Sequence, residues 1–291
     1  MSSDIMPMTE HRPRRQRSQD SGAADAALLF DEPGPRGRIL IAIGSVVAVI
    51  GIAALAAAVL YRLDLAGQLD YPKWRYFLGQ SVVSQLLEAA GTTLTLGGVA
   101  AVLTFPLGIA LGWLRLLDNR PIKWLIGLWI DAMRAVPMLL LVYFFLLVVP
   151  RFATISDFWR LALPIVMCTS ATTAEVFRSG VRALDRGQTE AAWALGMSPS
   201  LTMRLILAPQ ALRLMLPTLI TQMVTIIKGT TLAYVLAYPE LMYRGSTMIG
   251  QAKIDAHLSV FFQTYVIIAV LYIIVNWSLG ALARYIESRT R

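Results

Sequence analysis

The sequence predicts an all-α integral membrane protein that crosses the bilayer six times. Of the 291 residues, 56% are apolar and only 15% are charged, whereas an ordinary soluble domain is about 25% charged. The chain also holds uncharged runs that exceed the roughly 20 residues needed to cross a bilayer as a helix. This composition excludes a disordered chain, and the single cysteine, Cys168, excludes a disulfide scaffold.

Six apolar segments are the expected spans. They are 39–60, 89–114, 124–150, 161–174, 214–239 and 258–283. Only three charged residues, Asp131, Arg134 and Lys228, lie inside them. The first is an extra N-terminal helix over 39–61, rich in small residues that allow close packing in lipid. We expect it to lie beside a core of five helices, with a specific regulatory contact as the alternative.

Lysine and arginine residues predict the orientation, because they accumulate on the cytoplasmic side of a membrane. With the N-terminus inside, the inner segments hold 17 of the 26 basic residues and the outer segments hold 7. We therefore expect both termini in the cytoplasm. The polar segment 1–38 is expected to be a disordered cytoplasmic tail that helps to set this topology, or else to bind anionic lipid or a partner.

The cytoplasmic segment 175–213 contains a helix, a break and a second helix. Good helix formers over 189–195 are followed by Gly196, at the place where a helix end favours a left-handed residue. Ser198 and Pro199 then provide an N-cap and a proline at the first helical position.

One face of the first of these helices is small and apolar. Ala191, Ala194 and Leu195 share it, because residues three and four apart lie on the same side of a helix. Such a face suits a groove on another protein, and a connector packed on the membrane surface is the alternative.

The same segment resembles the EAA loop of ABC importer permeases, which reads E-A-A-x3-G-x9-I-x-L-P. The matching residues are Glu190, Ala191, Ala192, Gly196, Ile206 and Pro209. Ala208 stands where the family usually has leucine, so the position stays apolar. Six of seven specified positions over twenty residues agree, which makes the motif specific.

Further segments resemble the polar-amino-acid subfamily of these permeases. They are Gly91-Thr92-Thr93-Leu94-Thr95-Leu96, Arg134-Ala135-Val136-Pro137, Ala174-Glu175-Val176-Phe177-Arg178-Ser179-Gly180 and Leu184-Asp185-Arg186-Gly187-Gln188. Asp185 replaces the usual proline, and segment 61–68 resembles actinobacterial glutamate-uptake permeases. The resemblance implies a permease domain over 88–284 and a cytoplasmic C-terminus over 285–291, in a bacterial cell membrane.

The resemblance also implies a function and partners. The chain is expected to be the permease subunit of an ATP-driven importer for a polar amino acid, with glutamate favoured, and not an enzyme. Two permease subunits, as a hetero- or homodimer, would form the pathway, and an extracytoplasmic binding protein would deliver the substrate. A separate ATPase dimer would bind ATP and Mg. The ATPase would couple through the loop 188–209, at Glu190, Ala191, Ala192, Ala194, Leu195 and Gly196.

Lys228 is the charge expected deepest inside the membrane, and charges inside spans usually face a protein interior or an aqueous path. With Thr230 and Thr231 beside it, Lys228 would hold a substrate carboxylate, or else form an internal salt bridge, for instance to Glu175.

Three further charges lie near the inner ends of the spans. Glu175 would bind an α-amino group or pair with Arg178. Arg134 is a substrate-path candidate, although its spacing from Asp131 favours a structural pair near the gate. Four prolines in or near the spans would permit hinging kinks, and they are Pro106, Pro137, Pro164 and Pro217.

Other functions fit the residues less well. The chain lacks a G-x-x-x-x-G-K-[ST] phosphate loop, so its energy would come from a partner or from an ion gradient. A self-powered secondary transporter would leave the loop motif without a purpose, and the chain shows no inverted repeat. Two histidines and one cysteine are too few for a metal centre, so no metal is expected. The basic charge follows the topology, so membrane lipids and no nucleic acid are expected as partners.

Overall fold

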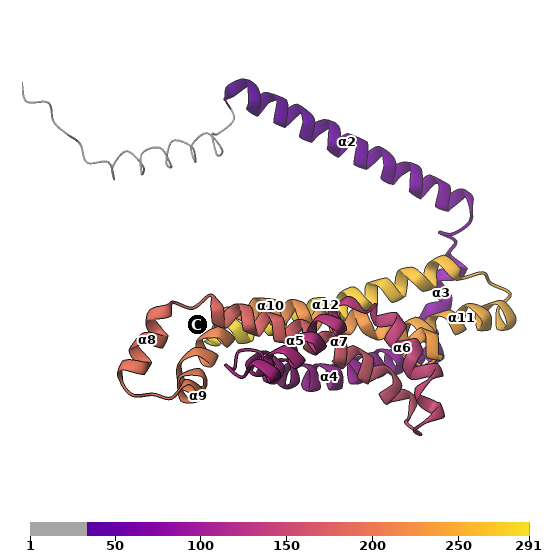
Figure 1. Ribbon diagram of the computed structural model, residues 1–291. Coiled ribbons are helices and arrows are strands. Elements are labelled where there is room, and N and C mark those ends of the chain that lie inside the picture. Colours follow the sequence, from indigo (N-terminus) through magenta and orange to yellow (C-terminus); the bar gives the residue numbers. More distant parts are fainter. Residues whose placement is uncertain (1–33, 291) are drawn as a thin grey trace, which may run out of the picture. The chain divides into compact units, whose positions relative to one another are not determined.

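The computed structural model describes residues 34–290, and these are helical, with no β-strand among them (Figure 1). They divide into two units, one ending at Gly67 and the other beginning at Gln68, and each is described by itself. The predicted tail over 1–38 lies outside the described residues except for 34–38.

The first unit consists of α2 (Pro35–Leu65), a helix of 31 residues. At about 1.5 Å per residue it is longer than the roughly 30 Å hydrocarbon core of a bilayer. Its apolar stretch is entirely exposed, and Ile41, Val49 and Ile52 each show more than half of their surface. Exposed apolar surface on this scale is typical of a helix in lipid. The predicted extra span over 39–61 lies within α2.

The second unit is a helical bundle. Its long helices are α4 (Gln80–Leu114), α7 (Asp157–Arg182), α10 (Ala208–Gly229) and α12 (Phe261–Thr290). Its shorter elements are α3 (Tyr71–Arg75), η1 (Tyr76–Leu78), α5 (Arg120–Ala135), α6 (Met138–Leu147), η2 (Val149–Arg151), α8 (Arg186–Ala194), α9 (Pro199–Thr202), η3 (Met203–Leu207), η4 (Thr230–Leu236) and α11 (Leu241–Asp255). Within this unit, α8, α9 and the C-terminal end of α12 lie at one end, and α3 and α11 lie at the other (Figure 1).

Helices α4 and α7 form the centre of the bundle, and small residues let them approach closely. A Cβ atom added to Gly112 would lie 2.6 Å from the carbonyl oxygen of Ala174, so only glycine fits there. The hydroxyls of Thr104 and Thr169 are 2.7 Å apart in the same buried contact. A hydrogen bond between buried hydroxyls satisfies both groups where no water reaches them.

The expected span over 124–150 is broken in two. Helix α5 ends at Ala135 and α6 begins at Met138, and their axes differ by 95°. Val136 and Pro137 between them are extended, with ψ of 127° at both residues. Proline lacks an N–H and disfavours helical geometry in the residue before it, so the predicted hinge at Pro137 is a full break.

Among the described residues, four helical segments are long and apolar enough to cross a membrane. They are 36–65, 80–114, 199–236 and 261–282, and the bent pair α5–α6 brings the total to five if it forms one span. The expected run 161–174 lies in α7, which is largely buried and carries charged residues at both ends. An all-α membrane protein is thus confirmed, while six spans stay a prediction.

Candidate functional site

Helix α8 and the turn after it carry the sequence motif. The left-handed Gly196 and the Ser198 cap are as predicted, whereas the helix begins at Arg186 and ends at Ala194 rather than covering 189–195. The carboxylate of Asp185 accepts a hydrogen bond of 2.7 Å from the N–H of Gly187 and so caps the start of α8. Gly196 follows the helix with φ of 78°, the left-handed conformation that glycine adopts without strain. Ser198 then caps α9 by accepting from the N–H of Leu201 at 3.4 Å.

The motif side chains of α8 point in two directions. Ala192 is 1% exposed and packs inside the protein, whereas Glu190, Ala191 and Ala194 are exposed. Leu195 is 82% exposed. An exposed leucine flanked by exposed alanines is a small apolar patch at the tip of the bundle. Such a patch can be covered by another protein.

Helix α8 is attached to the long helices by its other side. The side-chain amide of Gln210 in α10 donates to that of Gln188 at 3.3 Å. A cavity of about 230 Å³ between the end of α4 and the α8–α9 turn is lined by Trp113, Trp193 and Met203, among others. The sequence reasoning did not single out these two tryptophans, of which Trp193 lies within the motif and Trp113 lies near the end of α4. Helix α8 is therefore bonded to α10 and shares a cavity with the end of α4.

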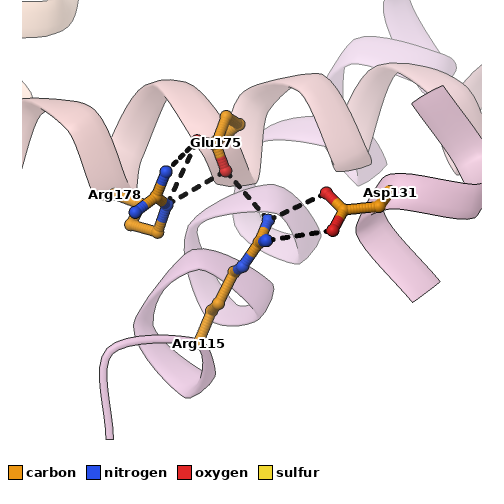
Figure 2. Close-up of polar contacts among 4 residues, drawn as sticks. All are labelled: Arg115, Asp131, Glu175 and Arg178. Atoms are coloured by element: carbon orange, nitrogen blue, oxygen red, sulfur yellow. Dashed lines mark hydrogen bonds and ion pairs between the residues drawn. The ribbon is translucent and has the colours of Figure 1, made fainter. Parts of the chain in front are cut away.

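A network of four charged side chains joins α4, α5 and α7 near the same end (Figure 2). Arg115 follows α4, and its guanidinium lies between Glu175 at 2.9 Å and Asp131 at 3.2 Å. Arg178 forms the second ion pair of Glu175. We call these four residues the inner brace, because Arg115, at the end of α4, forms ion pairs with both α5 and α7.

The inner brace bears on two expectations, the pair of Asp131 with Arg134 and the role of Glu175. The predicted pair of Asp131 with Arg134 is wrong, because Asp131 pairs with Arg115 instead. Gly127 is buried on α5 next to the Arg115 guanidinium, and a Cβ at this position would lie 3.6 Å from its Nε, at ordinary contact distance. Of the two roles expected for Glu175, pairing with Arg178 is confirmed. Arg134 is exposed, and no ion pair to it is found in the described part of the chain.

Lys228 lies at the end of α10 and is exposed. Glu175, which the alternative names as an internal partner of Lys228, is occupied by two arginines instead. The helix changes at Thr230 from α to 3-10 geometry, and the hydroxyl of Thr231 donates to the Lys228 carbonyl at 2.7 Å. Within residues 34–290, Lys228 has no ion-pair partner, so its charge is available to a ligand.

Glu240 is a buried acid that the sequence reasoning missed. It is fully buried, and it accepts hydrogen bonds from the hydroxyl of Tyr272 at 2.6 Å and from the N–H of Tyr243 at 2.8 Å. Burial raises the pKa of the Glu240 carboxyl. Its position after Pro239 at the start of α11 is the only signal in the sequence, and it indicates a helix start rather than burial.

The described residues contain no group of three histidine, cysteine or acidic side chains placed to hold a metal ion. Cys168 is buried in α7, and a buried free cysteine packs as a small apolar residue.

Comparisons with known sequences are consistent with the EAA-like loop. Residues 104–291 match the family described as "Binding-protein-dependent transport system inner membrane component". Over 230 residues the chain is 34% identical to the glutamate transport system permease protein GluD of Corynebacterium glutamicum, covering 77% of this chain and 82% of the relative. Over 198 residues it is 33% identical to the probable glutamine ABC transporter permease protein GlnP of Bacillus subtilis, covering 68% and 89%.

Solved structures share the fold. An amino acid ABC transporter crystallised with histidines matches with a TM-score of 0.64 and 24% identity over 72% of this chain and 95% of that one. An inward-facing MetNI methionine ABC transporter matches with a TM-score of 0.62 and 15% identity over 73% and 99%. The family match covers more than half of the chain, and two relatives are more than 30% identical over most of their length. The chain therefore belongs to the family of binding-protein-dependent transport system inner membrane components, the permeases of ABC importers.

Proposed function

We propose that the chain is the permease subunit of an importer that moves a polar amino acid into the cytoplasm by alternating access, driven by a separate ATPase. The observation that carries this proposal is the exposed apolar face of α8, which holds the motif and is attached to the spans. The similarity to permeases named for glutamate and glutamine supports the substrate class. Glutamate is favoured, and another polar amino acid is the alternative.

The exposed side of α8 would dock in a cleft of the ATPase. Fully burying a leucine contributes about 1.5–3 kcal/mol, so Leu195 is the largest apolar contribution, and Ala191 and Ala194 let the helix approach closely. Glu190 adds a charge at the edge of the patch, and Gly196 supports the turn. ATP and Mg would be bound by the ATPase, with no cofactor on this chain.

Force from the ATPase would reach the pathway through two attachments of α8. The chain runs from α8 through α9 and η3 directly into α10, which leads to Lys228. The second attachment is at the cavity lined by Trp113 and Trp193, where α8 lies beside the end of α4. Arg115 directly follows this end of α4. We assign the inner brace to the cytoplasmic gate, where it would hold the inner ends of α4, α5 and α7 together.

The orientation and the partners follow from the same proposal. The end that carries α8 would face the cytoplasm, and the C-terminal end of α12 lies at the same end (Figure 1). The distribution of lysine and arginine supports an N-terminus that is also inside. A second permease subunit would complete the pathway, with a heterodimer favoured. An extracytoplasmic binding protein would meet the end that carries α3 and α11.

Within the pathway, Lys228 is the proposed ligand of a substrate carboxylate. Its exposure at the junction of α10 and η4, beside Thr230 and Thr231, supports this role, since an ammonium without an ion-pair partner is costly in lipid. Arg134 is a second exposed cation on the broken span. Glu175, already neutralised by two arginines, is assigned to the gate rather than to the α-amino group.

The test is ATP-driven uptake into proteoliposomes that hold the permease with its ATPase and binding protein. Radiolabelled glutamate, glutamine, aspartate, arginine and histidine are compared, and we expect glutamate to accumulate fastest. The Gly196→Asp variant should insert normally but fail in uptake, because it adds a carboxylate beside the apolar docking patch, where burying an unpaired charge is costly. Uptake without ATP, or normal uptake by this variant, would contradict the proposal.

A further inference from the structure

An open groove with a basic lining lies between α5 and α7, beside the inner brace. Its volume is about 390 Å³. The charged groups that line it are Arg115, Lys123, Asp131, Arg178 and Arg182, and Glu175 lies behind it as the partner of two of the arginines. Four cations against two carboxylates leave a net charge of +2. A groove of this charge attracts an anion.

Two of the four cations are not engaged elsewhere. Arg115 and Arg178 are bound to carboxylates, as Figure 2 shows. Lys123 and Arg182 are both exposed, and neither forms an ion pair with another described residue. Lys123 brings three N–H donors and Arg182 brings five. They face the groove from different helices, so one anion between them could accept from both.

The groove also has an apolar wall that a free ion does not need. Trp124 and Leu128 line it from α5 and are 69% and 53% exposed. Leu125 and Trp129 on the same helix are 60% and 41% exposed. Exposed tryptophan beside lysine and arginine is typical of the membrane–water interface, where the ring lies among lipid headgroups.

The position along the bundle agrees with that interface. The part of α4 that is long and apolar enough to cross a membrane ends at Leu114, and Arg115 is the next residue. The groove therefore lies at the level where acyl chains give way to headgroups. Clusters of basic side chains at this level bind the headgroups of anionic lipids.

We propose that this groove binds the phosphate of an anionic phospholipid, held by Lys123 and Arg182 with the acyl chains along Trp124 and Leu128. The bound lipid would bridge α5 and α7 next to the inner brace and so stabilise the gate region. A free phosphate shares the charged half of this chemistry but makes no use of the apolar wall. The proposal is independent of the transported substrate.

The test is a titration of the purified full-length chain in detergent, followed by native mass spectrometry. Phosphatidylglycerol is the probe, and phosphatidylcholine is the zwitterionic control. At roughly 1 kcal/mol per cation, the double variant Lys123→Gln/Arg182→Gln should bind phosphatidylglycerol about 30-fold more weakly, because 1.4 kcal/mol corresponds to a factor of about ten.

Two further variants separate the charge from the fold. The charge-conserving Lys123→Arg/Arg182→Lys should bind as the wild type does. The matched variant Arg75→Gln/Lys253→Gln removes one exposed lysine and one exposed arginine at the other end of the bundle, and it should leave binding unchanged. A loss of binding in the matched variant, or in the charge-conserving one, would overturn the site.

Inorganic phosphate distinguishes the two sources of the anion. Millimolar inorganic phosphate should fail to displace phosphatidylglycerol if the acyl chains contribute, and displacement would mean that the groove takes free phosphate and not lipid. Equal binding of phosphatidylglycerol and phosphatidylcholine would also refute the proposal. So would a Lys123→Gln/Arg182→Gln variant that still binds phosphatidylglycerol but no longer binds the ATPase, because the two cations would then belong to the ATPase interface.

Discussion

The inner brace predicts an ordered series of stability losses. The Arg115 and Glu175 side chains are 19% and 22% exposed, whereas Asp131 is 59% exposed. A hydrogen bond to a charged, partly buried group contributes about 1.5–3 kcal/mol, while an exposed ion pair contributes about 0.2–1 kcal/mol. We therefore expect Arg115→Met to lower the free energy of unfolding by about 2 kcal/mol and Asp131→Asn to lower it by about 0.5 kcal/mol.

Thermal unfolding in detergent, followed by intrinsic tryptophan fluorescence, measures this series. At about 2–4 °C per kcal/mol for a domain of this size, Arg115→Met should lower the Tm by about 4–8 °C and Asp131→Asn by about 1–2 °C. A double-mutant cycle between Arg115 and Glu175 should give a coupling free energy above that of the Arg115–Asp131 cycle. If Asp131→Asn lowers the Tm as much as Arg115→Met, the Arg115–Glu175 pair is not the stronger of the two ion pairs of Arg115.

Three other predictions use separate parts of the molecule. Gly112→Ala should lower the free energy of unfolding by about 1–3 kcal/mol, because the added Cβ meets the α7 backbone. The control Gly98→Ala, whose Cβ would have nothing within 4 Å, should be neutral or stabilising by about 0.5–1 kcal/mol. Equal losses of Tm in the two variants would refute the close packing of α4 on α7. Burial raises the pKa of Glu240, so the Tm should fall as the pH rises above 4.5, the ordinary pKa of a glutamate carboxyl. Glu240→Gln should remove this pH dependence, and a dependence that persists in the variant would contradict the assignment to Glu240. Lys228→Met should slow glutamate uptake without reducing assembly, and an unchanged rate and apparent affinity would remove Lys228 from the pathway.

Local signals could be predicted from the sequence because each depends on a few neighbouring residues. Gly196 at a helix end, and Ser198 before Pro199, specify a break and a cap whatever surrounds them. Uncharged runs likewise predict α2, α4 and α12, since length and composition are sufficient for a span. The hinge at Pro137 was predicted in place but not in size, because a 95° bend depends on what each half packs against.

Long-range partners could not be predicted in the same way. The i, i+3 spacing of Asp131 and Arg134 allows a pair, but Arg115, sixteen residues earlier, reaches Asp131 from another helix. The i, i+3 spacing indicates Arg178 as one partner of Glu175, but nothing local indicates Arg115 as the second. Glu240 lies in a segment that counts as a loop in the sequence, and only the packing of α11 and α12 buries it.

The central claim is that α8 is the surface through which the ATPase drives this permease. The most direct measurement is the affinity of the detergent-solubilised permease for its ATPase, comparing Glu190→Lys with Asp255→Lys. Both variants reverse an exposed acid, and Asp255 lies at the other end of the bundle (Figure 1). We predict that Glu190→Lys weakens binding at least tenfold, or about 1.4 kcal/mol, and that Asp255→Lys leaves it unchanged. Equal affinities for the two variants would contradict the assignment of α8.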